Sequence, residues 1–371
     1  MVPTGPSAST PTSAPARALA PAPEVVLEIL DGCAELAAQE ASVLGPVRIV
    51  GPTEAVVDTD DLTGAAALRR SVAAYLCIRI PARRPQELLE TSVMRHLGQA
   101  LQRLQQHRPR SARFTGLRLA AAGAGTPVME RLAQELAAAV DLPVDAEDGD
   151  LLVRVRPAAR TEGAPRAWEV LARLTPRPLS TRAWRTVDYP GAVNATIAAC
   201  VMTLMDISGE DELLDMTCGS GTLLIEQSFL AAPRRAVGVD LAPAAIEAAR
   251  AHQRSARRKG RIDWIVGDVL TADLPGGFTR IVANPPWGEI HGEHATNQDL
   301  LASLLARADE LGAPGCRVGI LTHEIRRMHA VLADPACAWT TVDEHRFFQK
   351  GHHPRLFRLR RRDEPCGRDG A

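Results

Sequence analysis

Residues 212–222 read E-L-L-D-M-T-C-G-S-G-T, a short apolar strand that runs directly into a glycine turn and then into a helix. A strand that ends in Gly-x-Gly before a helix exposes backbone N–H groups and lets a ligand approach the main chain closely. There is no G-K-[ST] in the chain, which argues against a P-loop. The third glycine of a dinucleotide-binding turn is also missing, since Thr222-Leu223-Leu224 follows Gly221. The stretch fits a nucleotide-like cofactor, but taken alone it more often marks a tight structural turn in some other Rossmann-like domain.

Three further strands each deliver a polar residue to the same rim. The strand A-V-G-V, residues 236–239, is followed by Asp240, where a carboxylate can accept hydrogen bonds from ribose hydroxyls. The next strand is followed by Asp268, and the one after it by N-P-P-W, residues 284–287. Each has a simpler interpretation as well: a helix cap at Asp240, a loop residue at Asp268 and a proline turn at N-P-P-W. Their order, each at a strand end, favours a ligand site at the carboxyl edge of the sheet.

The second half of the chain alternates strands with helices. Strands are expected at 212–216, 236–240, 261–266, 279–283 and 316–322, and helices at 192–205, 222–231, 243–257 and 298–311. This alternation predicts an α/β domain with a doubly wound, mostly parallel sheet. Residues 340–348 and 356–361 flank a turn and predict a terminal hairpin, which adds an antiparallel strand.

The first half predicts a separate α+β domain. Strands are expected at 25–30, 72–80, 114–121 and 151–156, and helices at 85–104 and 128–140. Residues 1–23 contain six Pro and six Ala and predict a disordered tail. The predicted order is a tail at 1–23, a first domain at 24–160, a Pro-rich linker with one short strand at 161–190, a second domain at 191–363 and a tail at 364–371.

Composition narrows the class of protein. The 371 residues are 46% apolar and 23% charged, as in ordinary globular proteins, and the net charge of −1 excludes a uniformly basic coat for nucleic acid. The seven cysteines are scattered without C-x-x-C spacing, so we expect neither a metal site nor a disulfide framework. No apolar run approaches the ~20 residues that span a membrane. We therefore expect a cytoplasmic protein without a membrane partner; no sequence feature sets an oligomeric state.

The ordered motifs carry a family resemblance. From about 191 to 363 the chain resembles the class I S-adenosylmethionine-dependent methyltransferases that modify exocyclic amino groups, whose N-P-P-[YFW] motif is similar to residues 284–287. The run D-M-T-C-G-S-G-T-L-L-I-E, residues 215–226, is similar to D-P-x-C-G-S-G-T-x-x-I-E of a narrower group. That group is the THUMP-containing RNA guanine methyltransferases, which make 2-methylguanosine in tRNA and rRNA. The lead-in R-P-L-S-T-R-A-W-R, residues 177–185, also looks like this group.

The first domain resembles the group more loosely. The stretch 114–156 is similar to the second half of a THUMP domain, a module that grips structured RNA. It departs from the family after its first strand, where basic residues are common and this chain has A-A-A-G-A-G-T, residues 120–126. The resemblance implies a Rossmann-like class I methyltransferase sheet preceded by an α+β THUMP-like domain.

The resemblance also implies a site. It implies that the protein uses S-adenosylmethionine as its cofactor and no metal. The implied partner is structured RNA, with tRNA favoured over rRNA. The residues that would bind the cofactor are Asp215, Cys218, Gly219, Gly221, Thr222, Asp240, Asp268 and Asn284. Asn284 and the carbonyl of Pro285 would accept hydrogen bonds from the substrate amine, and Trp287 would stack on the flipped base.

Three other functions fit parts of the pattern. Enzymes that methylate the amino group of DNA adenine or of protein glutamine also use N-P-P-Y, and the THUMP-like half disfavours them. A non-catalytic RNA-binding protein could retain the fold. The intact sets at 215–222 and 284–287 argue against that interpretation.

Overall fold

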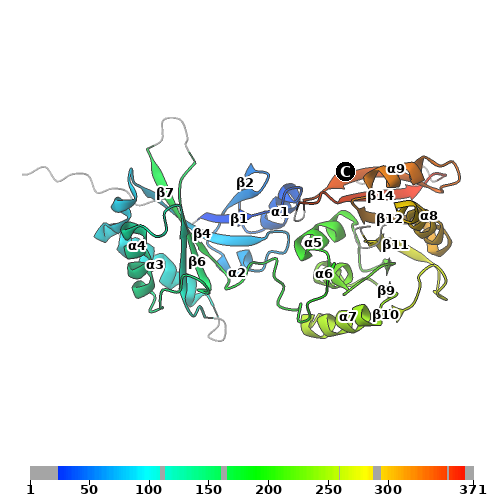
Figure 1. Cartoon of the computed structure of the whole chain (residues 1–371), viewed down its shortest axis with the longest axis horizontal. Helices are drawn as coiled ribbons and strands as arrows, with labels where there is room; N and C mark the ends of the chain where they lie inside the picture. The colour runs from blue at the N-terminus through cyan, green and yellow to red at the C-terminus, as the bar shows by residue number, and fades with distance from the viewer. Residues whose placement is uncertain are drawn as a thin grey trace, which may run out of the picture.

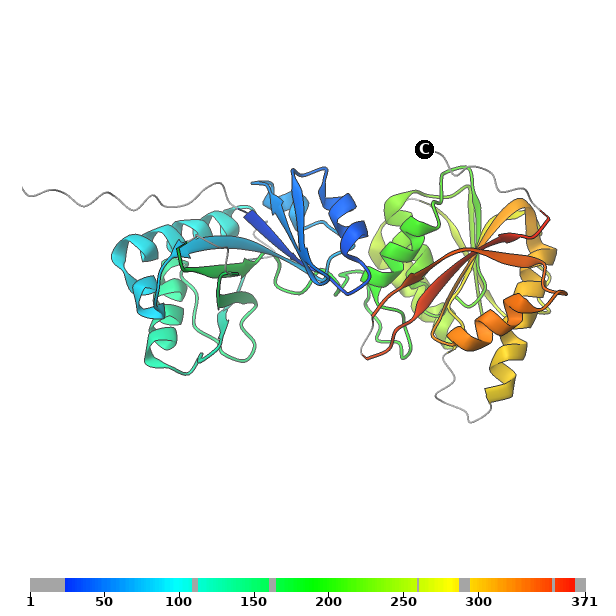
Figure 2. The same ribbon diagram turned by 90° about the horizontal axis from the view of Figure 1, so that it is seen from above.

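Two seven-stranded sheets, one after the other along the chain, make up the fold (Figure 1). The protein is described from a computed structural model, which covers residues 24–108, 113–159, 165–258, 260–286, 294–348 and 351–363. Figures 1 and 2 both show the two domains end to end along the long axis of the molecule. A continuous set of buried residues joins them, since one apolar cluster runs from Val25 in the first sheet to Ile246 in the second domain.

The N-terminal sheet has the strand order β2-β3-β1-β4-β7-β6-β5. Neighbouring strands pair antiparallel, except for the parallel pair β5–β6. Its strands are β1 (Glu24–Glu28), β2 (Val47–Gly51), β3 (Glu54–Asp58), β4 (Ala73–Pro81), β5 (Leu117–Ala121), β6 (Leu151–Pro157) and β7 (Ala167–Arg173). Its helices are α1 (Ala34–Ala41), α2 (Leu62–Ala65), the 3₁₀ turn η1 (Pro85–Leu89), α3 (Thr91–Gln106) and α4 (Pro127–Ala139). The apolar faces of α1, α3 and α4 belong to the main core on one side of this sheet.

The second sheet has the order β10-β9-β8-β11-β12-β14-β13. Its strands are β8 (Glu212–Asp215), β9 (Arg235–Asp240), β10 (Ile262–Val266), β11 (Phe278–Ala283), β12 (Gly312–Thr322), β13 (Trp339–Arg346) and β14 (Arg355–Arg361). Its helices are α5 (Ala195–Leu204), α6 (Thr222–Leu230), α7 (Pro243–Ala256), α8 (His294–Leu311) and α9 (Ile325–Ala333). The first five strands in this order, β10, β9, β8, β11 and β12, are parallel to one another. The last two, β14 and β13, each pair antiparallel with the strand before them in this order.

Helices cover both faces of this second sheet. Residues of α5, α6 and α7 share a core with Leu213, whereas residues of α8 and α9 share a core with Leu214. Successive residues of a strand point to opposite faces, so the two cores lie on opposite sides of the sheet. The predicted doubly wound sheet with an antiparallel hairpin is confirmed.

Several elements depart from the sequence predictions. The hairpin β2–β3 and the helices α2 and α9 were not predicted, because β2 and β3 have five residues each and Pro52-Thr53 is not a typical hairpin turn. The short strand expected within the 161–190 linker is β7, which pairs with β4 on one side and β6 on the other. This strand is therefore central to the N-terminal sheet, and the connection between the domains runs from 174 to 194.

The terminal hairpin also contacts the first domain. The backbone N–H of Phe348 donates to the carbonyl of Asp31 at 3.1 Å, and the ring of His345 contacts the carbonyl of Gly32 at 2.5 Å. A Cβ on Gly32, where φ is +86°, would lie 2.0 Å from the carbonyl oxygen of Arg346. The glycine therefore allows the hairpin and the β1–α1 loop to approach each other closely.

Candidate cofactor and substrate site

The four predicted strand ends meet at one edge of the second sheet. Because β10, β9, β8 and β11 are parallel neighbours, their carboxyl ends lie on the same side. Two hydrogen bonds connect the loops that follow them. The N–H of Gly219 donates to Oδ2 of Asp240 at 2.8 Å, and the N–H of Asn284 donates to Oγ1 of Thr217 at 3.0 Å. The structure therefore brings the glycine turn, Asp240 and Asn284 into one site.

The two glycines of the turn have different roles. Gly219 has φ +51°, and a Cβ built there would meet nothing within 4 Å, so the turn faces open space. Gly221 has φ +81°, and its Cβ would lie 2.5 Å from the indole of Trp264. We infer that Gly219 leaves room for a ligand, whereas Gly221 leaves room for the Trp264 ring on β10.

Cys218 and Thr222 are packed rather than open. Burial raises the pKa of the Cys218 thiol well above its ordinary value, so the group stays a neutral thiol and not a nucleophile. The hydroxyl of Thr222 accepts a hydrogen bond of 2.8 Å from Arg185, which lies in the segment before α5. These two side chains therefore stabilise the turn, and only the backbone of Cys218 and Thr222 could face a cofactor.

The surroundings of Asp215 indicate a bound ligand more clearly than those of the other site residues. It is fully buried at the end of β8, and among the described residues its Oδ2 has no hydrogen-bond partner. Oδ1 accepts from the N–H of Thr217 at 3.3 Å. Burial, followed by the nearby charge of Asp240, raises the pKa of Asp215 to about 7. A buried carboxylate in this state fits a ligand that brings a positive charge or a strong donor.

Asp240 and Asp268 hold their own loops. Asp240 accepts from the N–H of Gly219 with one oxygen and from the N–H of Ala242 with the other, at 2.9 Å. Asp268 accepts from the N–H of Leu270 at 3.0 Å. The alternative of a helix cap thus describes part of the role of Asp240. Each carboxylate oxygen has two lone pairs, so both residues, which are half-buried, can accept further bonds from a nucleoside.

The N-P-P-W segment begins against the glycine turn. Asn284 is half-buried, Pro285 is buried and Pro286 is exposed. Pro fixes φ near −65°, so consecutive prolines make this part of the loop stiff. Trp287, predicted to stack on the base, lies outside the described residues. The role of Thr217 in holding Asn284 was not predicted, since nothing in the sequence shows that these positions touch.

A second unpredicted residue is His252 on α7. The sequence suggests a solvated basic helix end at 250–261, but His252 is fully buried. Its Nδ1 lies 3.0 Å from the carbonyl of Ser220, and its Nε2 accepts from the N–H of Val187 at 3.1 Å. His252 thereby fixes the segment before α5 against the glycine turn. Its spacing of three, four and seven residues from Ala249, Ala248 and Ala245, all buried, is the signal that could have revealed it.

The described residues show neither a metal-binding cluster nor a membrane-spanning helix. They contain no group of three or more His, Cys, Asp or Glu side chains arranged to hold a metal ion. Within the same residues, every helix is too short or too polar to cross a membrane.

Comparison with known proteins supports the fold. The crystal structure of TrmN from Thermus thermophilus aligns with a TM-score of 0.67 and 23% identity, over 91% of this chain and 99% of that chain. A tRNA (guanine(6)-N2)-methyltransferase of Thermus thermophilus is 31% identical over 204 residues, which are 53% of this chain and 56% of that protein. The ribosomal RNA large subunit methyltransferase K/L of Vibrio campbellii is 28% identical over 190 residues, 39% of this chain and 26% of that protein.

The chain thus spans about half, or less, of the length of these curated relatives. Residues 182–355 match the family UPF0020, described as "RMKL-like, methyltransferase domain". The match includes the glycine turn, Asp240, Asp268 and Asn284, and the predicted resemblance to methyltransferases is confirmed. Residues 182–355 therefore form a domain that is similar to the RMKL-like methyltransferase domains, and an N-terminal α+β domain precedes it.

Proposed function

We propose that this protein transfers a methyl group from S-adenosylmethionine to the exocyclic 2-amino group of guanosine in tRNA. The observation that supports this most is the bond between Thr217 and Asn284, which sets the N-P-P segment beside the open glycine turn. A methyl donor and an amine acceptor can meet only where such elements adjoin. Similarity to proteins named tRNA (guanine-N2)-methyltransferases supports the same substrate.

The residues at the glycine turn fit the cofactor. Asp215 and the backbone around Gly219 would face its methionine portion, Asp240 its ribose and Asp268 its adenine. The buried Oδ2 of Asp215, which has no partner among the described residues, matches the cationic methionine portion, because an ionised carboxylate in this place needs a compensating charge. When bound, the cofactor supplies an electrophilic methyl group.

The chain's own residues would prepare the nucleophile. The lone pair of a guanine 2-amino group is delocalised into the ring, so the nitrogen is a poor nucleophile. Acceptors at Asn284 Oδ1 and the Pro285 carbonyl would draw the amine hydrogens and favour a pyramidal nitrogen. Acceptors fixed in advance stabilise the positive character that develops on nitrogen in the transition state, and they need no reorganisation. The stiff Pro285-Pro286 backbone and the Thr217 bond both serve this purpose.

Ribosomal RNA is the second candidate substrate. It is favoured by the similarity to the Vibrio campbellii K/L protein, although that alignment covers only 26% of the relative. We rank tRNA first because the two relatives named tRNA (guanine(6)-N2)-methyltransferases align with 42% and 53% of this chain, against 39% for the K/L protein.

The test is a methyl-transfer assay with the full chain. The protein is incubated with S-adenosylmethionine and, in parallel, unfractionated tRNA, ribosomal RNA or duplex DNA, and the digested nucleosides are identified by mass spectrometry. We expect 2-methylguanosine in the tRNA reaction. Product only in ribosomal RNA would select the second candidate, and 6-methyladenine in DNA would contradict both. Binding of tRNA without any methylated nucleoside would instead favour the non-catalytic interpretation.

A further inference from the structure

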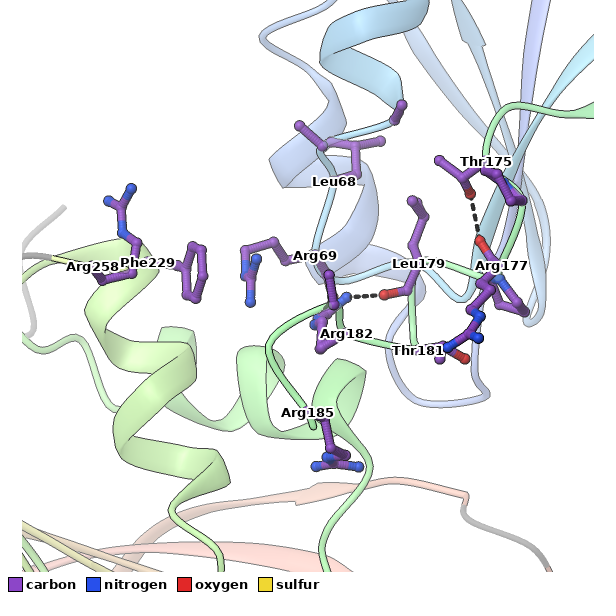
Figure 3. Close-up of a pocket in the computed structure, with 15 residues that line it drawn as sticks. Leu68, Arg69, Thr175, Arg177, Leu179, Thr181, Arg182, Arg185, Phe229 and Arg258 are labelled. Atoms are coloured by element: carbon purple, nitrogen blue, oxygen red, sulfur yellow. Dashed lines mark hydrogen bonds between the residues drawn. The ribbon is translucent and has the colours of Figure 1, made fainter. Parts of the chain in front are cut away.

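A cavity of about 810 Å³ lies where the two domains and their connection meet (Figure 3). Its walls come from residues 66–69 of the first domain, residues 175–185 of the connection, and Phe229 and Arg258 of the methyltransferase domain. We call it the arginine pocket, after the five arginines that line it: Arg69, Arg177, Arg182, Arg185 and Arg258.

The arginine pocket has a strong positive charge. No Asp or Glu is among its described lining residues. The buried Glu226 of α6 lies behind its wall and pairs with Arg69 at 2.7 Å and with Arg182 at 2.8 Å. Glu40 acts on Arg69 and Asp188 on Arg185, so five arginines meet three acids, none of which lines the pocket. A cavity with this imbalance focuses a field that attracts anions.

The guanidinium groups of the pocket are held in fixed positions. Figure 3 shows the Phe229 ring between Arg69 and Arg258, and their guanidinium carbons lie 3.5 and 4.9 Å from its centroid. Arg185 donates to Thr222 and to the carbonyl of Val193, while its buried Nε has no partner among the described residues. Burial lowers the pKa of Arg69 and of Arg185, so an anion here would relieve a cost of burial.

Several arginines elsewhere on the protein are paired with acids. On the open face of the N-terminal sheet, Arg79 and Arg156 both pair with Glu169, and Arg154 pairs with Glu28. On the terminal hairpin, Arg355 pairs with Glu344, Arg358 with Asp343 and Arg361 with Asp309. The stretch 120–126 after β5 has no charge at all. These surfaces therefore offer an anion less than the arginine pocket does.

We propose that the arginine pocket binds the sugar–phosphate backbone of the RNA substrate and so fixes the RNA on both domains at once. This inference rests on the proposed function. Guanidinium groups bind phosphate oxygens in bidentate fashion, and phosphate contacts position nucleic acid without reading its sequence. The pocket touches α6 at Phe229, and Arg185 links it to Thr222, the first residue of that helix, directly after the glycine turn. RNA held here would lie beside the helix that begins at the proposed cofactor turn.

The test replaces the two exposed arginines of the pocket and leaves Arg69, Arg182 and Arg185 unchanged. Arg177→Gln and Arg258→Gln change exposed side chains, so the fold is retained. The control is Arg131→Gln on α4, whose exposed arginine is already paired with Glu135. Figure 1 shows α4 on the side of the N-terminal domain that faces away from the methyltransferase domain. Affinity for fluorescently labelled unfractionated tRNA is measured over a range of salt concentrations, together with S-adenosylmethionine affinity and methyl transfer at saturating tRNA.

We expect the double variant to bind tRNA about tenfold more weakly at a fixed salt concentration and to lose about 1.4 to 1.8 from the salt slope, at about 0.7 to 0.9 per phosphate contact. Its cofactor affinity and its rate at saturating tRNA should match the wild type, and Arg131→Gln should match it throughout.

Unchanged tRNA affinity in a double variant that still methylates would overturn this inference and leave the proposed function standing. The binding of inorganic phosphate is measured on the wild type and on the double variant. If the double variant loses phosphate binding but keeps its tRNA affinity, the inference is also overturned, in favour of a small-anion site. A wild-type protein that neither binds nor methylates tRNA would refute the proposed function itself.

Discussion

Replacing Glu226 by Gln should destabilise the protein by about 3–5 kcal/mol, the usual result of removing one partner from a buried ion pair. Glu226 is fully buried between the domains and accepts from Nε and Nη2 of Arg69 at 2.8 and 2.7 Å and from Nε of Arg182 at 2.8 Å. Glutamine has nearly the same size, so no cavity forms. It removes the charge that pairs directly with both guanidinium groups, and its amide NH₂ faces a donor.

The loss can be measured by guanidinium chloride unfolding, from the shift of the midpoint at constant slope. The control is Glu210→Gln, which breaks the ion pair with Arg234, where the side chains are 83% and 61% exposed. Such a surface pair contributes about 0–1 kcal/mol. Arg69→Gln should fall between the two, because Glu226 keeps Arg182 as a partner.

The reasoning fails if Glu226→Gln and Glu210→Gln lower the free energy of unfolding equally. A Glu226→Gln protein that does not fold leaves Arg69→Gln as the decisive comparison. If that variant is as stable as Glu210→Gln, the buried cluster does not hold the domains together.

Three predictions concern the proposed methyl-transfer site. Asp215 should keep its proton up to about pH 7 in the native protein but lose it near pH 4 in the unfolded chain. The cofactor-free protein should therefore lose stability as the pH rises between these values. Urea unfolding at pH 5 and pH 8 should show this loss in the wild type, and Asp215→Asn should lack the contribution of this carboxyl group. Asn284→Ala should lower the single-turnover rate by about 10²–10³-fold with nearly unchanged cofactor affinity by calorimetry, and a wild-type rate would remove N-P-P-W from catalysis. Thr217→Val should lower the same rate by about tenfold because the Asn284 N–H loses its acceptor, whereas Thr217→Ser should keep it; equal rates for both variants would exclude a positioning role.

The sequence predicted those parts of the fold that depend on local pattern. The strands β8 to β11 are apolar runs that each end in a distinctive residue, so both their existence and their common rim could be predicted. The hairpin β2–β3 could not, since Val47–Gly51 is mostly exposed and has no buried alternation to reveal it. The strand β7 was found but assigned to a linker, because its partners β4 and β6 are decided by tertiary pairing.

The site was predictable only as a set of strand ends. Glu226 stood in the quoted motif without a role, because its partners Arg69 and Arg182 are 157 and 44 residues away. His252 was misjudged for the same reason: its contacts with Ser220 and Val187 lie 32 and 65 residues from it. Long-range contacts of this kind leave no periodic trace in one sequence.

These long-range contacts converge on the connection between the domains. Within a few residues, Arg182 binds Glu226 near the middle of α6 and Arg185 binds Thr222 at its start, directly after the glycine turn. Glu226 in turn binds Arg69 of the N-terminal domain. One short helix is thus tied at one end to the proposed cofactor turn and along its side to the other domain. A displacement of the N-terminal domain would have to move α6, break the buried ion pairs or reorder the connection, and the first two are costly because α6 is packed and Glu226 is buried. RNA gripped by both domains would therefore meet a methyl-transfer site whose distance from the N-terminal domain is fixed by the fold.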